Sequence, residues 1–217
     1  MRLRNIPRAE EIIGAHSAAI KEEKEYRGKW TEVFQNKQPI HIEIGMGKGQ
    51  FILNLAKRNP AINYVGIERY SSVLLRALEK YDEHEYEELT NIRFICMDAH
   101  ELDQVFALNE VDKIYLNFSD PWPKARHMKR RLTSKEFFEL YDKVLAEQGQ
   151  VEFKTDNRVL FDFSVEQLNT SDTWKITTCT YDLHQDKKMN VGNVMTEYEE
   201  KFSNLGHPIH KLIANRK

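Results

Sequence analysis

The chain has 217 residues, of which 41% are hydrophobic and 30% are charged, and its formal net charge at pH 7 is -2. This length suits one sizeable domain with a full core, and the composition is that of a soluble globular protein. A charge so close to zero excludes a uniformly basic nucleic-acid binder, although it permits a local basic patch. No apolar stretch suits a signal peptide or a membrane span, so we expect a cytoplasmic protein without a membrane partner.

The first 35 residues are polar and show no core pattern, so we expect residues 1–35 to form an N-terminal arm, helical or partly flexible. A single domain then extends over residues 36–217. It opens with five short apolar runs that are typical of strands: PIHIEIG, INYVGIE, NIRFICMD, VDKIYLNFSD and QVEFKTD. Apolar residues at helical spacing, such as Leu74 and Leu78, fall between most of these runs. A capping-box pattern over residues 133–136 marks the start of one helix.

Strands that alternate with helices predict a parallel sheet with helices on both faces. Two later runs, WKITTCTYD and TEYEEKFS, look like strands without a long helix between them. We expect these runs to form an antiparallel hairpin at the sheet edge. The predicted fold is therefore a Rossmann-like α/β fold, with a mostly parallel seven-stranded sheet and a C-terminal antiparallel strand. Cys96 and Cys179 lie within such runs, which favours reduced thiols in the core.

Carboxylates recur at or near the ends of the five predicted parallel strands: Glu43, Glu68, Asp98, Asp120 and Asp156. In open α/β sheets, ligands bind in the crevice outside these strand ends. Five carboxylates on one rim repel each other unless a ligand supplies positive charge or hydrogen-bond donors. The rim is therefore the expected binding site.

The first strand leads into a glycine loop with three glycines that let the backbone approach a ligand closely: Gly45, Gly47 and Gly49. Their G-x-G-x-G spacing differs from that of dinucleotide binders, and no hydroxyl residue follows the lysine as in a phosphate loop. Glu43 suits a ligand with an ammonium or sulfonium group, and Glu68 is placed to accept from both ribose hydroxyls. Asp98 is placed to accept from an adenine amino group. Together these features predict S-adenosylmethionine as the cofactor.

The segment SDPWPKARHMKRR follows the fourth strand and joins a stiff loop to a basic run. Pro121 and Pro123 fix backbone angles and so aim Asp120 at the site of methyl transfer. Trp122 either pins this loop to the sheet, which we prefer, or stacks on a base. Eight residues after the loop carry five basic side chains and no acid, at Lys124, Arg126, Lys129, Arg130 and Arg131. Phosphates are the natural partner of such a run, so we expect the acceptor to be a nucleic acid.

The motifs EIGMGKG, SDPWPKARHMKRR, FKTD and TEYEEKF resemble those of the bacterial tRNA (guanine-N7-)-methyltransferases, over about residues 40–205. The resemblance implies a methyltransferase domain that methylates N7 of the variable-loop guanine in tRNA. It implies cofactor contacts at Glu43, Glu68, Asp98 and Asp120, with Asp120 also catalytic. Implied substrate contacts are Lys124, Asp156, Thr196, Glu197, Tyr198 and Glu199. Implied RNA contacts are Arg126, His127, Met128, Lys129, Arg130 and Arg131.

Guanine N7 has an in-plane lone pair and no proton, so it attacks a sulfonium methyl group without a strong base. The enzyme must supply in-line geometry and stabilise a purine that becomes cationic. We expect Asp120 to position the guanine and offset this charge. Asp156 and Glu199 suit the guanine N1–H and 2-amino groups, and Thr196 adds a hydroxyl contact. Tyr198 either stacks on the base or packs within a strand.

Other functions stay open on the sequence alone. A methyltransferase of exocyclic amines usually carries Asn/Asp-Pro-Pro-aromatic, where this chain has Asp-Pro-Trp-Pro. A non-catalytic RNA-binding module would not need the intact glycine loop, and a nicotinamide-dependent oxidoreductase is disfavoured by the glycine spacing. The eight histidines do not cluster with Cys or acids, so no metal site is expected. We expect a monomer or homodimer without an obligatory protein subunit.

Overall fold

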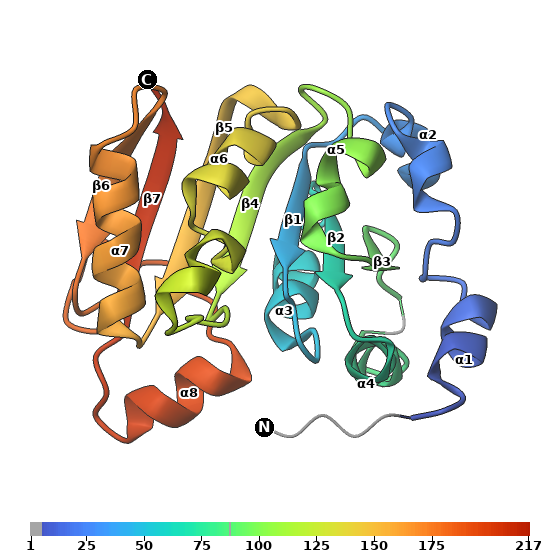
Figure 1. Ribbon diagram of the computed structural model, residues 1–217. Helices are drawn as coiled ribbons and strands as arrows, with labels where there is room; N and C mark the ends of the chain where they lie inside the picture. Colours follow the sequence, from blue (N-terminus) through green and yellow to red (C-terminus); the bar gives the residue numbers. More distant parts are fainter. Residues whose placement is uncertain (1–5, 87) are drawn as a thin grey trace.

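The computed structural model describes residues 6–86 and 88–217, and it is centred on a seven-stranded sheet of order β3-β2-β1-β4-β5-β7-β6 (Figure 1). The strands are β1 (Ile40–Ile44), β2 (Asn63–Glu68), β3 (Ile92–Cys96), β4 (Val111–Asn117), β5 (Leu145–Thr155), β6 (Trp174–Thr180) and β7 (His210–Arg216). Strands β1 to β5 pair in parallel, whereas β7 runs antiparallel to both β5 and β6. The predicted fold class is confirmed.

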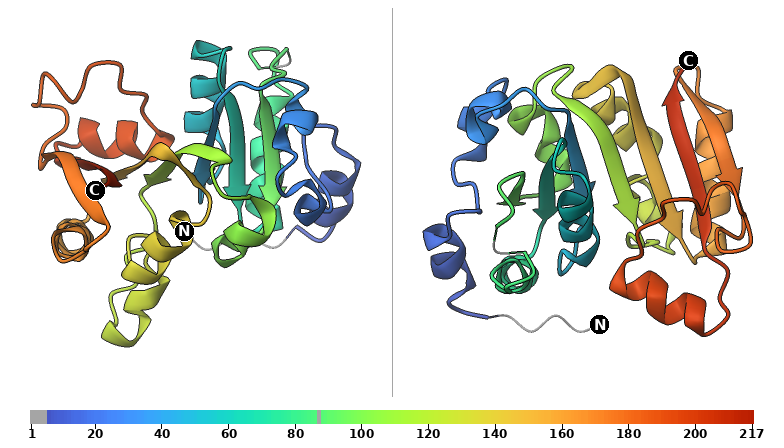
Figure 2. Two further views of the ribbon diagram at one scale, coloured as in Figure 1. Left: turned by 90° about the horizontal axis from the view of Figure 1, so that it is seen from above. Right: turned by 180° about the vertical axis from the view of Figure 1, so that it is seen from behind.

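Helices cover both faces of this sheet (Figure 2). One face carries α3 (Gln50–Arg58) and α4 (Ser71–Tyr81), with α1 (Ala9–Ala15) against α4; the other carries α5 (Leu102–Val105), α6 (Lys135–Tyr141) and α7 (Arg158–Asn169). Helix α8 (Glu197–Asn204) lies at the carboxyl ends of the parallel strands (Figure 1). The shorter elements are α2 (Trp30–Phe34), η1 (Glu23–Tyr26), η2 (Ala99–Glu101) and η3 (Ala125–Arg130).

Two apolar clusters fill the space between the sheet and its helices. Ile40, Ile42 and Ile44 of β1 share one cluster with side chains of α5, α6 and α7. Tyr64 and Tyr115 belong to the other cluster, with α3 and α4. This division follows from the period of two along a strand, which sends alternate side chains to opposite faces.

The expected edge hairpin is only half correct. Residues 174–180 form β6, but TEYEEKFS forms the start and body of α8, and the partner strand is β7. Thr196 caps α8, because its hydroxyl accepts from the Glu199 backbone N–H at 2.9 Å. Acidic residues in the first turn favour a helix N-terminus. The prediction of a strand there was therefore wrong.

The predicted capping box before α6 is also misplaced. The helix begins at Lys135, and its N-cap is Ser134, whose side chain makes no capping bond. Thr133, which precedes α6, instead accepts from the hydroxyl of Ser164 on α7 at 2.6 Å, in a buried contact. The Thr133 hydroxyl therefore makes a tertiary hydrogen bond in place of the helix cap that the local sequence pattern predicts.

The described part of the expected N-terminal arm packs into the domain. Phe94 of β3 accepts from Ile20 and donates to Ala18, both at 2.9 Å, so residues 18–20 extend the sheet beyond β3. Trp30 is fully buried, stacks on Phe106 at 5.0 Å and donates to the Val105 carbonyl at 3.0 Å. The prediction that this segment contributes nothing to the core was wrong. Its short helices bury single large residues such as Trp30 and have no periodic apolar face that the sequence could reveal. Residues 1–5 of the arm lie outside the described residues.

The two cysteines differ in exposure. Cys96 on β3 is partly buried, whereas Cys179 on β6 is exposed. Since β6 is the last strand of the sheet, only part of its surface is covered. The prediction of two core thiols was wrong for Cys179.

Candidate active site

A cavity of about 950 Å³ opens at the carboxyl ends of β1, β2 and β4, between the glycine loop, the loop after β4 and the start of α8. It brings together most of the predicted cofactor and substrate residues. Those that line it are Glu43, Gly45, Gly47, Gly49, Glu68, Asp98, Asp120, Thr196, Glu197, Tyr198 and Arg130. The predicted residues outside its lining are Lys124, Asp156, Glu199, Arg126, His127, Met128, Lys129 and Arg131.

The glycine loop places backbone donors on the floor of the cavity. Gly47 has a φ of 60°, in the left-handed region that favours glycine, and its N–H donates to Glu68 Oε2 at 3.1 Å. Gly49 begins α3 beside α4, where an added Cβ would lie 3.1 Å from Ala77 Cβ. Gly49 also has a positive φ, 78°, so both positions favour glycine for conformational reasons, and Gly49 has little room for a side chain in addition.

Glu68 closes β2 as a nearly buried carboxylate. Its Oε1 accepts from the Tyr70 N–H at 3.1 Å, in addition to the bond from Gly47 to Oε2. Burial raises the pKa of Glu68, and these backbone bonds oppose the rise. Glu68 lines the cavity, and a carboxylate oxygen can accept more than one hydrogen bond, so the group can also accept from ligand hydroxyls.

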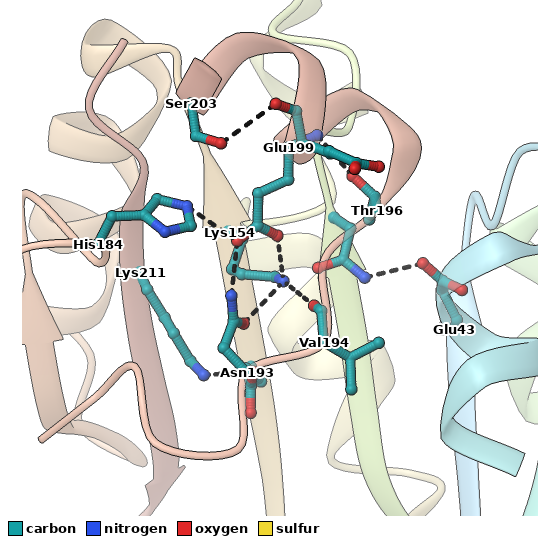
Figure 3. Close-up of polar contacts among 12 residues, drawn as sticks. Glu43, Lys154, His184, Asn193, Val194, Thr196, Glu199, Ser203 and Lys211 are labelled. Carbon is teal, nitrogen blue, oxygen red and sulfur yellow. Dashed lines mark hydrogen bonds and ion pairs between the residues drawn. The ribbon is translucent and has the colours of Figure 1, made fainter. Parts of the chain in front are cut away.

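Glu43 and Asn117 form a buried polar pair in the lining of the cavity, and Glu43 is labelled in Figure 3. Glu43 Oε1 accepts from Asn117 Nδ2 at 2.8 Å. Glu43 Oε2 and Asn117 Oδ1 are buried, and neither has a hydrogen-bond partner among the described residues. Burial raises the pKa of Glu43 to about 8, against the opposing effects of Asn117 and Lys154. Two adjacent unpaired acceptors call for a ligand with a positively charged donor.

Asp98 begins η2 at the far side of the cavity. Its carboxylate accepts from the His100 backbone N–H at 3.0 Å and lies 2.6 Å from His100 Nδ1. Burial acts to raise the pKa of Asp98, but the bonds from His100 and the charge of Arg69 lower it below its usual value. Asp98 is therefore an ionised acceptor at neutral pH.

The loop after β4 is held in a strained conformation. Phe118 and Trp122 both have positive φ values, 50° and 41°, which cost on the order of 1–3 kcal/mol each for such residues. Asp120 lies between them and is exposed. A strained loop keeps its conformation only where contacts with its surroundings offset the cost of the strain. The position of Asp120 therefore depends on the contacts that hold this loop.

Arg131 supplies those contacts. Its guanidinium donates to the Pro121 carbonyl at 2.9 Å and to the Trp122 carbonyl at 3.2 Å, and it lies 4.3 Å from the Phe163 ring centroid. Arg131 is only 6% exposed. The prediction that Arg131 contacts RNA is not supported by this position, because the side chain is buried and its Nε and Nη2 bond to the loop. Arg131 therefore pins the loop, and the role of Trp122 stays a prediction.

The rest of the basic run lies on η3, at the rim of the cavity. Lys124, Arg126, Lys129 and Arg130 are exposed, whereas His127 is half-buried. Arg130 lies over the Trp122 ring at 5.0 Å, and His127 packs edge-on against it at 5.6 Å. The exposed Met128 shares this surface. Of these four cations Arg130 lines the cavity, and Lys129 pairs with Glu136 at 3.0 Å on the surface beside it.

The first turn of α8 forms the opposite wall. Tyr198 packs on Phe202 at 4.1 Å and on Phe118 at 4.8 Å, and its hydroxyl donates to Asp156 Oδ2 at 3.0 Å. Burial, together with this bond, raises the pKa of Tyr198 to about 12, so it remains a phenol. The wall is tied to the glycine-loop side by Glu197, which pairs with Lys80 at 2.5 Å and Lys48 at 3.5 Å.

Glu199 lies on the same turn but faces away from the cavity (Figure 3). It is fully buried, and its two oxygens accept from Lys154 at 2.6 Å and from Asn193 at 2.7 Å. The prediction of Glu199 as a guanine acceptor is not supported by this position, because the carboxylate has no free side towards the cavity.

No group of three or more His, Cys, Asp or Glu side chains lies where it could hold a metal ion within residues 6–86 and 88–217. Over the same part of the chain, none of the helices has both the length and the apolar character needed to cross a membrane.

Comparison with known proteins shows the family to which this chain belongs. A family model described as a putative methyltransferase matches residues 37–212. A tRNA (guanine-N(7)-)-methyltransferase of Lachnoclostridium phytofermentans is 57% identical over 216 residues, which cover 100% of this chain and 99% of that protein. The chain belongs to the tRNA (guanine-N(7)-)-methyltransferase family. Another member, from a Geobacillus species, is 50% identical over 97% of this chain and 94% of its own length.

More distant solved structures share the fold of this tRNA (guanine-N(7)-)-methyltransferase family member. An antibiotic-related methyltransferase superposes with a TM-score of 0.64 at 17% identity, and covers 91% of this chain and 96% of its own. The 16S rRNA (adenine(1408)-N(1))-methyltransferase of Catenulisporales acidiphilia gives a TM-score of 0.60 at 11% identity, over 87% and 92% of the two chains. The fold is therefore that of known methyltransferases.

S-adenosylmethionine is the methyl donor of this methyltransferase, and the cavity fits it. The unpaired acceptors of Glu43 and Asn117 suit the ammonium of an amino-acid tail. Sequence reasoning missed Asn117, although a polar residue at the end of the apolar run IYLN was a visible signal. It also missed the buried Lys154, a charge inside a central strand.

Proposed function

We propose that this methyltransferase transfers the methyl group of S-adenosylmethionine to N7 of the variable-loop guanine in tRNA. The observation that carries the proposal is the position of Asp120. It lines the cofactor cavity, and the basic surface of η3 begins only five residues later. A ribonucleotide held by η3 through its phosphates can thus present a base to the cavity. With tRNA as the substrate, we expect the enzyme to work in the cytoplasm, as a monomer or homodimer without an obligatory subunit.

Different residues of the cavity bind different groups of the cofactor. When bound, S-adenosylmethionine supplies an electrophilic sulfonium methyl group. Glu43 and Asn117 hold its ammonium group, Glu68 accepts from its ribose hydroxyls, and Asp98 accepts from its adenine amino group. These contacts fix the direction in which the methyl group points, which is the larger part of catalysis for a nucleophile that needs no base.

The guanine end of the cavity is formed by the strained loop and by α8. Asp120 offsets the positive charge that develops on the purine when N7 is alkylated. Asp156 accepts from the guanine edge, and the Tyr198 hydroxyl that now occupies it orients this carboxylate. Lys124, Arg126, Lys129 and Arg130 bind the phosphates beside the target nucleotide.

The test is methyl transfer from labelled S-adenosylmethionine to unmodified tRNA, with the modified base located by mass spectrometry and by strand cleavage specific for N7-methylguanosine. One N7-methylguanosine in the variable loop is expected. A methyl group on an exocyclic amine would favour the exocyclic-amine reaction, and cofactor binding without transfer would favour a non-catalytic RNA-binding module. Asp120→Asn should lower kcat by about 10²–10³-fold, the scale of one preorganised electrostatic group, with cofactor and tRNA binding largely kept.

A further inference from the structure

Lys154 is a buried charge whose bonds all go to one segment (Figure 3). It lies on β5 and is fully buried, and its ammonium donates to Glu199 Oε2 at 2.6 Å, the Val194 carbonyl at 2.9 Å and Asn193 Oδ1 at 3.3 Å. A lysine has three donors, so this one is saturated. Every acceptor belongs to residues 193–199, the segment that leads into α8 and forms its first turn.

The segment is also closed upon itself. Asn193 Nδ2 donates to the second oxygen of Glu199 at 2.7 Å, and Thr196 caps the Glu199 N–H at 2.9 Å. His184 Nε2 lies 3.3 Å from Glu199 Oε1. Residues 193–199 therefore behave as one unit that is joined to the sheet through the ammonium of Lys154.

The opposite side of this unit is the wall of the active site. Thr196, Glu197 and Tyr198 line the cavity, and Tyr198 reaches Asp156. Consecutive helical residues point about 100° apart, so Glu199 can face the sheet while Tyr198 faces the cavity. Any rotation of the first turn of α8 at Glu199 moves Tyr198 by the same angle.

A buried ion pair is a poor source of net stability, because desolvation offsets most of its attraction, and an apolar pair of similar volume often serves as well. The pair instead fixes the orientation of the first turn of α8, because the three hydrogen bonds of Lys154 are directional and apolar contact is not. We propose that Lys154 and Glu199 are positioning residues, which hold the first turn of α8 so that Tyr198 and Asp156 meet the target base. This assignment rests on the proposed function, and it gives Glu199 no contact with the base.

The experiment compares Lys154→Met, Glu199→Gln and the double variant Lys154→Met/Glu199→Gln. Each single change should lower Tm, because it leaves a partner without its charge, and the double change should restore most of that loss. The kcat/KM for tRNA should fall by about 10²-fold in all three, the scale of a small misplacement, and should not recover in the double variant. The Kd for S-adenosylmethionine without RNA should stay within about twofold in Glu199→Gln, which leaves the cofactor contacts and Lys154 untouched. The two variants that lack Lys154 should bind the cofactor more weakly at pH 7, because the Lys154 charge lowers the pKa of Glu43.

The matched control is Lys211→Met/Glu152→Gln. Lys211 and Glu152 form another buried pair, at 2.7 Å, between β7 and β5. Glu152 also pairs with Lys113 of β4 at 2.8 Å, and among the described residues none of these side chains bonds to α8. This control should change Tm and leave kcat/KM for tRNA unchanged. Should Lys154→Met fail to fold, the double variant and Glu199→Gln still decide the question.

Three outcomes overturn the proposal. A double variant with normal Tm and normal kcat/KM would make the pair merely structural. A much larger kcat/KM loss in Glu199→Gln than in Lys154→Met would return Glu199 to direct contact with the base. An equal loss in the Lys211 and Glu152 control would make the effect a general one of stability. Failure of the wild-type protein to methylate tRNA would instead refute the proposed function.

Discussion

The raised pKa of Glu43 leads us to expect that cofactor binding releases a proton. Its pKa in the free protein is about 8, raised from 4.5 chiefly by burial. At pH 7 this carboxyl is therefore about 90% protonated, one pH unit below its pKa. The ammonium of the cofactor favours the carboxylate form, so binding at pH 7 should release up to about 0.9 proton per cofactor.

The sign of the pH dependence follows from the same shift. Between about pH 6 and pH 7 the free carboxyl must lose its proton to bind, so cofactor affinity should rise about tenfold per unit. The rise should end near pH 8, where both Glu43 and the amino group of the ligand titrate. In the free protein, the raised pKa of Glu43 also contributes to the free energy of unfolding. This contribution is complete below pH 4.5 and is lost as the pH rises to about 8.

The assay is isothermal titration of the protein with S-adenosylmethionine in buffers of different ionisation enthalpy, at pH 7. The dependence of the binding heat on buffer enthalpy gives the number of protons released. Glu43→Gln should release none and should bind about 1.5–3 kcal/mol more weakly, the cost of losing a charged hydrogen bond. Asp98→Asn is the control, since it should weaken binding and keep the proton release. A wild-type proton number near zero would refute the reasoning.

Two predictions concern the basic segment. Arg131→Lys should lower kcat by about tenfold, since a lysine cannot bond both loop carbonyls in the same fork, while steady-state kinetics should show little change in KM for tRNA. A raised KM with normal kcat would return Arg131 to RNA binding. The triple variant of Arg126, Lys129 and Arg130 to alanine should raise KM, and the log–log salt slope of tRNA binding should shrink by up to about 3 units. An unaltered slope would mean that these side chains do not contact phosphates.

The parallel sheet and the carboxylate rim were predictable because both follow from local pattern and topology. Apolar runs such as PIHIEIG identify strands, and the rule for open sheets places the acids that follow them on one edge. Glu43, Glu68 and Asp98 do line one cavity. No relation between distant segments is needed for that inference.

The roles of Arg131, Lys154 and Glu199 could not be predicted because they depend on neighbours distant in sequence. A basic run gives no sign that one arginine turns inward to hold carbonyls nine and ten residues earlier. Lys154 and Glu199 are 45 residues apart, and their pairing requires the path of the chain between β5 and α8. Trp30 was missed for the same reason, since its partners lie about 75 residues away.

The two edges of the sheet limit how copies of this chain can associate. At one edge, residues 18–20 bond to both backbone groups of Phe94 in the middle of β3 and so block another strand there. At the other edge, the β6 ladder shifts register between Ile176 and Thr178, and the Thr177 hydroxyl turns to Ile213 and Asn215. A bulged edge strand is a poor template for pairing. A homodimer of this methyltransferase would therefore be built on helices and loops, and the sheet would end within each subunit.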